Sequence, residues 1–196
     1  MNLPNRLTIL RIFLTFVFMF LLFSPGLLGK VLALVAFTIA CLTDFYDGYV
    51  ARKYNLITDL GKLLDPIADK ILVMTAFLAF VEMRLVPAWM VVVIILRELI
   101  ITGIRIIGVS KGKVLAASMA GKHKTVSQMV SIFFILGVII IKEAGSAGLS
   151  FWKDEYEIFL NSSIYILMLI TVALTLISGI SYFIKNRNIF WDLKDG

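Results

Sequence analysis

Two pairs of aspartates stand between positions 44 and 69 of an otherwise apolar chain, at spacings that could hold a metal ion. Asp44 and Asp47 are three positions apart, and Asp65 and Asp69 are four positions apart. Side chains at these separations are neighbours on one face of a helix, so each pair predicts two adjacent carboxylates. Oxygen ligands alone favour magnesium, manganese or calcium over zinc, which prefers nitrogen and sulfur. The four residues therefore predict a divalent-metal site.

The cost of four charges in apolar surroundings supports this prediction. An ionised aspartate at the centre of a bilayer costs about 2.5 to 3.5 kcal/mol, so four of them would cost roughly 10 kcal/mol. That is comparable with the whole stability of a typical domain, about 5 to 15 kcal/mol. Converging carboxylates also repel one another. One or two bound cations remove both penalties, whereas the plain alternative is four unrelated surface aspartates.

The aspartates belong to a longer pattern, D-x2-D-G-x2-A-R-x8-G-x3-D-x3-D. It is filled without a mismatch by Asp44, Asp47, Gly48, Ala51, Arg52, Gly61, Asp65 and Asp69. This pattern resembles the signature of the CDP-alcohol phosphatidyltransferase family. The resemblance implies a reaction in which a hydroxyl group of an acceptor attacks the phosphorus next to diacylglycerol in CDP-diacylglycerol, and CMP leaves.

The resemblance also implies a role for each signature residue. All four aspartates match the metal ligands of the family, for which we expect Mg²⁺ or Mn²⁺ and two bound ions. Asp69 also matches the proposed general base. Gly48, Arg52 and Gly61 match positions that contact the CDP portion, although from the residues alone helix packing explains either glycine equally well. A homodimer is expected from the resemblance only.

The composition places these residues in a membrane. Hydrophobic residues make up 60% of the 196 residues and the mean hydropathy is +0.97, which excludes a soluble domain of this size. Long apolar runs favour helices over the alternating strands of a barrel. We expect an all-α, polytopic membrane protein that forms a single domain over residues 1–196. Its six transmembrane helices are predicted at about 7–24, 30–52, 62–83, 87–109, 124–142 and 157–184.

Two local signals mark expected helix starts. Pro66 fits the first turn of the third predicted helix, where a missing N–H group costs nothing. Asn5 or Thr8 fits the cap of the first helix, although both could instead contact the nucleotide.

The basic residues predict the orientation in the membrane. If the N-terminus is cytoplasmic, fifteen of the 19 lysines and arginines lie on or toward that side, and four lie on the other: Lys30, Arg84, Lys142 and Lys153. This positive-inside bias predicts a multi-pass protein of the cytoplasmic membrane. Both termini and the metal site, between the second and third helices, would face the cytoplasm. The bias also accounts for the net charge of +6, so membrane lipids rather than nucleic acid are the expected partners.

A second polar cluster consists of Arg97, Glu98, Arg105, Lys122, His123 and Lys124. Arg97 and Arg105 are eight positions apart, about two helical turns, and share a similar face. A buried arginine is costly without an acidic or phosphate partner, so we expect a phosphate-bearing acceptor. Its predicted phosphate ligands are Arg97, Arg105, Lys122 and Lys124. Pairing of Arg97 with Glu98 is the alternative, which is weakened because adjacent helical residues point apart. For the two lysines, anchoring at the cytoplasmic surface is an equal explanation.

Residues 2–8, 97–105 and 121–125 resemble the branch of this family that uses sn-glycerol 3-phosphate as acceptor. The resemblance predicts an enzyme of phospholipid biosynthesis that transfers the phosphatidyl group of CDP-diacylglycerol to sn-glycerol 3-phosphate. An inositol phosphate, serine or phosphatidylglycerol acceptor is the alternative within the family. Outside the family, the aspartates could serve a divalent-cation transporter, although Arg52 and the two glycines suit a phosphate ligand better.

Overall fold

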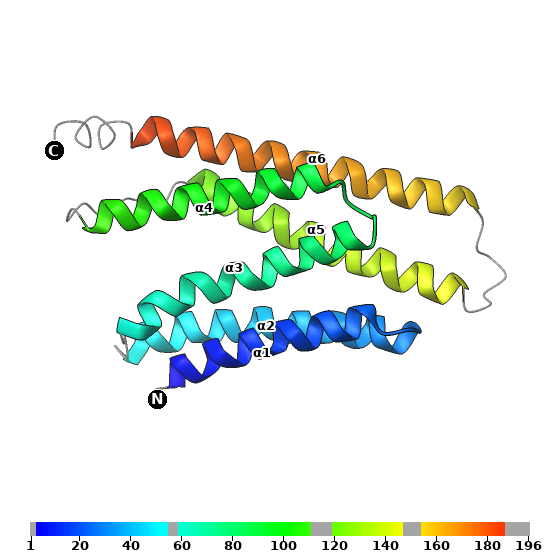
Figure 1. Ribbon diagram of the computed structural model, residues 1–196, viewed down its shortest axis with the longest axis horizontal. Helices are drawn as coiled ribbons and strands as arrows, with labels where there is room; N and C mark the ends of the chain where they lie inside the picture. The colour runs from blue at the N-terminus through cyan, green and yellow to red at the C-terminus, as the bar shows by residue number, and fades with distance from the viewer. Residues whose placement is uncertain (1–2, 55–58, 111–118, 147–153, 187–196) are drawn as a thin grey trace.

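The computed structural model is built from helices (Figure 1). It describes residues 3–54, 59–110, 119–146 and 154–186, and within them the side chains of 9–43, 70–106, 108, 121–145 and 155–186. The described ranges hold no strand and six helices: α1 (Leu3–Phe23), α2 (Leu27–Tyr54), α3 (Asp59–Glu82), α4 (Ala88–Ser110), α5 (Met119–Ser146) and α6 (Asp154–Lys185). The all-helical prediction is confirmed, and each predicted apolar stretch coincides with one of these helices.

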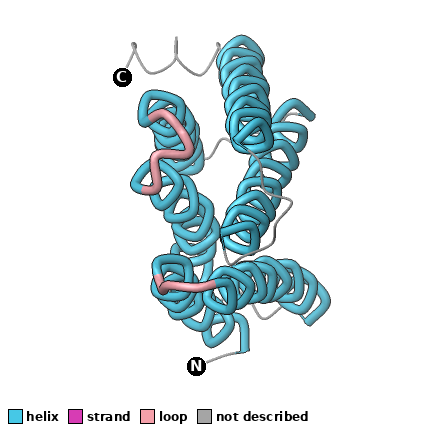
Figure 2. Tube along the Cα trace, turned by 90° about the vertical axis from the view of Figure 1, so that its right-hand side faces the viewer, coloured by secondary structure: helices cyan, strands magenta, loops and turns pink. Residues whose placement is uncertain are grey.

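The helices form one elongated bundle, which Figure 2 views along its length. α1 packs against α2 and α3, α5 packs against α2 and α6, and α4 packs against α3 and α6. The left end in Figure 1 holds the start of α1, the end of α6, and the ends of α2 and α3 that carry positions 44–69. We call it the signature end. The described turns α1–α2 and α3–α4 lie at the opposite end, which faces the viewer in Figure 2.

The centre of the bundle is held by aromatic side chains. Phe18 of α1 and Phe37 of α2 are fully buried, with ring centroids 5.4 Å apart. Phe133 of α5 meets Phe37 at the same separation in an edge-on arrangement. Such edge-on and tilted contacts add about 0.5 to 1.5 kcal/mol each to the burial of the rings. The core therefore ties α1 and α5 to α2, the helix that carries the first half of the signature.

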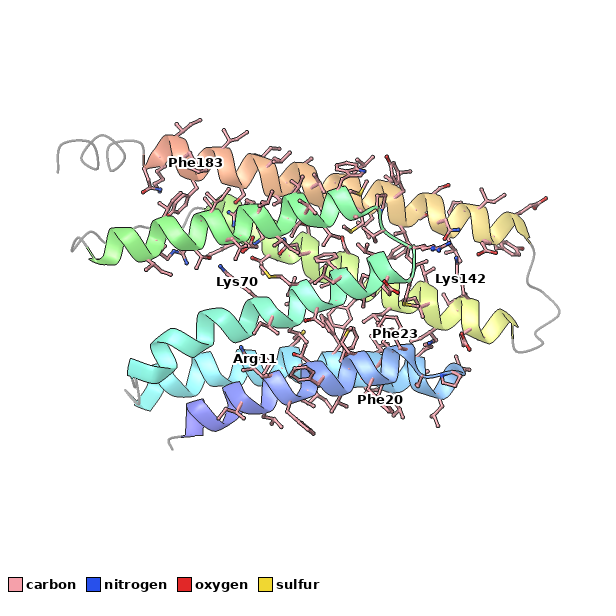
Figure 3. The ribbon with its side chains drawn as sticks, viewed as in Figure 1. Arg11, Phe20, Phe23, Lys70, Lys142 and Phe183 are labelled. Atoms are coloured by element: carbon pink, nitrogen blue, oxygen red, sulfur yellow. The ribbon has the colours of Figure 1, made fainter. Side chains whose placement is uncertain are left out.

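The outer surface of the bundle is apolar. Phe16, Phe20 and Phe159 are 71%, 78% and 69% exposed, and Phe20 lies on the lower, outer side of α1 in Figure 3. A soluble monomer rarely exposes large contiguous apolar patches. By length and composition, two described stretches could cross a membrane, Gly121–Gly145 and Glu155–Lys185. The structure is consistent with a membrane protein, and the six spans stay a prediction.

Two helices begin earlier than the local signals indicate. α3 begins at Asp59, so Pro66 is its eighth residue and lies beyond the first turn. There the missing N–H group of proline removes a hydrogen bond inside the helix. α1 already includes Pro4, so Asn5 and Thr8 lie within the helix and do not cap it. Both predictions were wrong because an aspartate and a proline, which suit a first turn, stand further upstream.

A lysine closes the turn between α1 and α2. The Nζ atom of Lys30 donates hydrogen bonds to the backbone oxygens of Leu22 and Ser24, at 2.6 and 2.9 Å. The last carbonyls of a helix lack partners within it, so this ammonium group caps α1. Gly26 has a φ of 87°, and a Cβ atom on Gly29 would collide with Ser24 Oγ. Gly26 therefore suits the left-handed backbone of this turn, Gly29 leaves room for the Ser24 hydroxyl, and the turn fixes α1 beside α2.

The turn between α3 and α4 uses an arginine where glycine is usual. Arg84 has a φ of 58°, in the left-handed region. The backbone N–H of Leu85 donates to the oxygen of Phe80 at 2.9 Å, and that of Arg84 donates to the oxygen of Val81 at 2.9 Å. These bonds end α3 sharply, and α4 then returns alongside it.

Candidate functional site

The signature aspartates occupy matching heights on two neighbouring helices. Asp44 lies ten residues before Tyr54, the last residue of α2, and Asp69 lies ten residues after Asp59, the first residue of α3. At 1.5 Å per residue, both positions are about 15 Å from the helix ends at the signature end. α2 and α3 contact each other and run in opposite directions (Figure 1). The backbone is therefore compatible with a site between α2 and α3.

The side chains of this part of the chain lie outside the described residues. This applies to the metal ligands Asp44, Asp47, Asp65 and Asp69 and to the CDP-binding residues Gly48, Arg52 and Gly61. Their backbone positions are described: Gly48 and Arg52 stand four positions apart on α2, and Gly61 is the third residue of α3. The roles of these seven residues stay predictions.

A pocket of about 600 Å³ lies between α3, α4, α5 and α6. Its cationic lining residues are Lys70, Arg97, Arg105, Lys122 and Lys124. Four of these are the predicted phosphate ligands, so the structure brings together residues that stand far apart in the sequence. His123, next to two of them, is exposed and does not line it. We call this site the cationic pocket.

One carboxylate organises three of these cations. Oε1 of Glu98 accepts hydrogen bonds from Lys124 Nζ and from Arg97 Nη1, the latter at 3.1 Å. Lys70 Nζ lies 3.9 Å from the other carboxylate oxygen of Glu98 and 3.4 Å from its backbone oxygen. Among the lining residues whose side chains the structure describes, five cations accompany this one acid. The surplus positive charge in a partly buried site favours an anionic ligand.

The pairing of Arg97 with Glu98 corrects the expectation from their spacing. Adjacent residues on a helix leave the backbone in different directions, yet the Arg97 Nη1 and Glu98 Oε1 atoms are 3.1 Å apart. Both side chains are long enough to curl back toward each other within the pocket. The ion pair does not neutralise the site, because Glu98 is shared with Lys124.

Lys70 connects the cationic pocket to the signature. It was not among the predicted ligands, yet it lines the pocket and directly follows Asp69. Figure 3 shows its side chain in the space between α3 and α4. Consecutive Cα atoms are about 3.8 Å apart, so the last signature aspartate stands one residue from the pocket wall. Along the backbone, the signature therefore adjoins the cationic pocket.

α6 supplies a wall that the sequence reasoning missed. Arg97 Nη2 donates a hydrogen bond to Ser178 Oγ at 2.8 Å. A Cβ atom on the next residue, Gly179, would lie 3.3 Å from Arg97 Cγ, so the glycine leaves room for the arginine side chain. Tyr182 lines the pocket one turn further on. The available signal was a serine and a glycine together within the apolar stretch 157–184, which also fits simple helix packing.

A buried arginine on α1 was likewise missed. Arg11 is 1% exposed, and α1 packs against the two helices that carry the signature. Figure 3 shows it on the side of α1 that faces the bundle. In the sequence, Arg11 is one of the fifteen cations whose distribution predicts the orientation. A fully buried guanidinium next to α2 and α3 is a candidate counter-charge for the signature carboxylates.

Comparisons with known proteins point to one family. The model of the CDP-alcohol phosphatidyltransferase family matches residues 1–183. The CDP-diacylglycerol–glycerol-3-phosphate 3-phosphatidyltransferase of Bacillus subtilis (strain 168) is 38% identical over 200 aligned residues, which cover 94% of this chain and 95% of that protein. The protein of the same name from Rickettsia typhi is 38% identical over 183 residues, covering 93% of this chain and 95% of the relative.

Proposed function

The chain belongs to the CDP-alcohol phosphatidyltransferase family, and from this premise we propose that it transfers the phosphatidyl group of CDP-diacylglycerol to sn-glycerol 3-phosphate. The products are phosphatidylglycerophosphate and CMP. The names of its relatives support this acceptor. The observation that carries the proposal is the cationic pocket, whose described lining residues include five cations and one acid, and whose Lys70 directly follows Asp69 in the chain.

The donor is assigned to the signature end of α2 and α3. Four carboxylates form an all-oxygen donor set that fits Mg²⁺ or Mn²⁺, and we propose two ions held by Asp44, Asp47, Asp65 and Asp69. When bound, such ions neutralise and orient the diphosphate of the donor. Gly48 and Gly61 allow close approach of the CDP portion, and Arg52 meets its phosphate.

Asp69 and the cationic pocket then act on the acceptor. The phosphate of glycerol 3-phosphate lies among the cations, with Arg97, Arg105, Lys122 and Lys124 as ligands. Its free primary hydroxyl attacks the phosphorus that bears diacylglycerol. Asp69 accepts the hydroxyl proton, a P–O bond to the acceptor forms, and the P–O bond to CMP breaks. Glu98 keeps Arg97 and Lys124 in place throughout.

The surplus charge also bears on the alternative acceptors. Serine carries no phosphate, and as a zwitterion its carboxylate is offset by its own ammonium group, so it would add no net negative charge to balance the cations of the pocket. An inositol phosphate would satisfy them and remains the closest competitor within the family. A divalent-cation transporter would have no use for five cations beside its metal site, and the matched family is one of transferases.

The setting of the reaction completes the proposal. We assign the whole chain, residues 1–196, to one membrane domain with six transmembrane helices in the cytoplasmic membrane. The signature end faces the cytoplasm, so glycerol 3-phosphate arrives from water and the lipid donor enters from the bilayer. A homodimer is the proposed assembly. The exposed apolar side chains and the positive-inside bias support this arrangement.

The test is CMP release by the purified protein with CDP-diacylglycerol, Mg²⁺ or Mn²⁺, and each candidate acceptor in turn. We expect release with glycerol 3-phosphate, and a loss of about 100-fold or more in Asp69→Asn, the scale of general-base catalysis. Glu82→Gln, the same acid-to-amide change at the exposed far end of α3, should keep full activity. Near-normal turnover in Asp69→Asn would remove the base assignment, and release only with another acceptor would change the substrate.

A further inference from the structure

Three buried polar atoms in the lining residues of the cationic pocket have no hydrogen-bond partner in the described structure. They are Arg97 Nε, the side-chain nitrogen Nε2 of Gln128, and the hydroxyl oxygen of Tyr182. Gln128 and Tyr182 are only 4% and 2% exposed. Burying a polar group without a hydrogen bond is unfavourable, so native proteins keep few such groups, and those kept often serve a function.

Two of these groups differ in kind from the cations of the pocket. The five lining cations complement the charge of a phosphate, whereas the amide of Gln128 and the phenol of Tyr182 are neutral. An amide nitrogen donates hydrogen bonds, and a phenol hydroxyl both donates and accepts them. Neutral groups of this type match alcohol hydroxyls. The pocket therefore offers a cationic part for phosphate and a neutral part, from α5 and α6, for a hydroxylated chain.

We propose that Gln128 and Tyr182 hydrogen-bond the hydroxyl-bearing carbon chain of a polyol phosphate acceptor and thereby set the specificity of the enzyme. The inference rests on the proposed function, because it concerns the same acceptor. Glycerol 3-phosphate has a primary hydroxyl, which attacks phosphorus, and a secondary hydroxyl, which survives the reaction. The secondary hydroxyl is the group that Gln128 and Tyr182 hold. A site built to hydrogen-bond a substrate hydroxyl discriminates against an analogue that lacks it.

A role of Tyr182 in packing can be distinguished from a role in acceptor binding. Its ring packs with Ile101 and Ile104 in a small apolar cluster, and that packing would survive replacement by phenylalanine. Because the hydroxyl has no hydrogen-bond partner among the described residues, its removal should leave the thermal unfolding midpoint of the substrate-free protein unchanged or raised. A loss of acceptor recognition together with unchanged stability would separate a binding role from a packing role.

The experiment compares two acceptors. The kcat/KM value is measured for glycerol 3-phosphate and for 3-hydroxypropyl phosphate, which keeps the phosphate and the primary hydroxyl but lacks the secondary one. We expect the wild-type preference for glycerol 3-phosphate to fall about tenfold in Tyr182→Phe and in Gln128→Met, a factor that corresponds to ~1.4 kcal/mol. Tyr165→Phe, at an exposed site on the same helix, should keep the preference.

The outcomes separate this inference from the function on which it rests. If the wild type turns over glycerol 3-phosphate and neither variant changes the preference, the inference is wrong and the proposed function stands. Equal losses with both acceptors in both variants would assign a structural role and also overturn it. If the wild type releases no CMP with glycerol 3-phosphate, both proposals fall.

Discussion

Glu98 is the residue on which the geometry of the cationic pocket depends. Its carboxylate contacts Arg97 and Lys124 and lies 3.9 Å from Lys70 Nζ, with only 13% of its own side chain exposed. Without this acid, three cations from α3, α4 and α5 would repel one another in a partly buried space. With it, they stay close together and still outnumber it. The pocket is thus assembled before any phosphate arrives.

Replacing Glu98 with glutamine should lower the stability of the protein and increase its response to a phosphate ligand. Breaking a buried ion pair by removing one partner typically costs about 3 to 5 kcal/mol, so we expect Glu98→Gln to unfold at a lower temperature than the wild type. Added glycerol 3-phosphate supplies negative charge to the cations that have lost the Glu98 carboxylate, so it should raise the unfolding midpoint of the variant more than that of the wild type. Thermal unfolding in detergent, with and without the ligand, measures both.

Glu157→Gln is the matched control for this prediction. Glu157 pairs with Lys142 at 3.1 Å, but its side chain is 51% exposed and far from the pocket. Exposed pairs contribute little, so the control should change stability by less than about 1 kcal/mol and leave the ligand response unaltered. Equal ligand responses in wild type and Glu98→Gln would argue against phosphate binding at these cations.

At the scale of single helices, the apolar stretches predicted the existence and order of all six elements. Their ends were harder to predict, because polar residues at the margins can continue a helix: α2 runs on to Tyr54 and α5 starts at Met119, beyond the apolar stretches themselves. Hydropathy reports where a helix is apolar, whereas the helix ends where its backbone hydrogen bonds end.

In the candidate site, too, some residues could be predicted from the sequence and others could not. The spacing of Arg97 and Arg105 placed both in one pocket, and local motifs added Lys122 and Lys124. Lys70 and the α6 wall could not be found this way, because their relevance depends on contacts across the bundle. The hydrogen bond from Arg97 to Ser178, for instance, joins residues 81 positions apart. A single sequence carries no periodicity or spacing that reports such a contact.

The α3–α4 turn offers a test of backbone strain. A residue with a side chain in the left-handed conformation costs roughly 1 kcal/mol, a penalty that glycine avoids. Because Arg84 has a φ of 58°, we expect Arg84→Gly to raise the free energy of unfolding by about 0.5 to 1 kcal/mol, with unchanged activity. Arg84→Ala removes the same side chain without relieving the backbone and should bring no gain. A stabilised alanine variant would instead point to the charge of the arginine.

At the scale of the whole molecule, charge and apolar surface divide the bundle. The cationic pocket and the signature positions lie toward one end, while the exposed aromatic side chains of α1 and α6 cover its flanks. This arrangement suits a protein whose flanks contact lipid and whose reactive end faces water. The proposed orientation can therefore be tested by asking which end of the bundle is accessible from outside the cell.

Cysteine labelling answers that question directly. The chain has a single cysteine, so Cys41→Ala gives a cysteine-free background. Lys185→Cys marks the signature end, and Glu82→Cys marks the opposite end. We expect a membrane-impermeant maleimide to label position 82 in intact cells and position 185 only after the membrane is opened. The reverse pattern would place the proposed active site outside the cell.

The adjacency of Asp69 and Lys70 has a consequence for how new enzymes can arise from this architecture. The donor chemistry is assigned to α2 and the start of α3, whereas α4, α5 and α6 complete the acceptor pocket. α3 contributes residues to both sites. Substitutions on the last three helices can therefore reshape the pocket while leaving the reactive aspartates untouched. A lineage could exchange one alcohol for another by gradual mutation of these helices while it keeps the same aspartates.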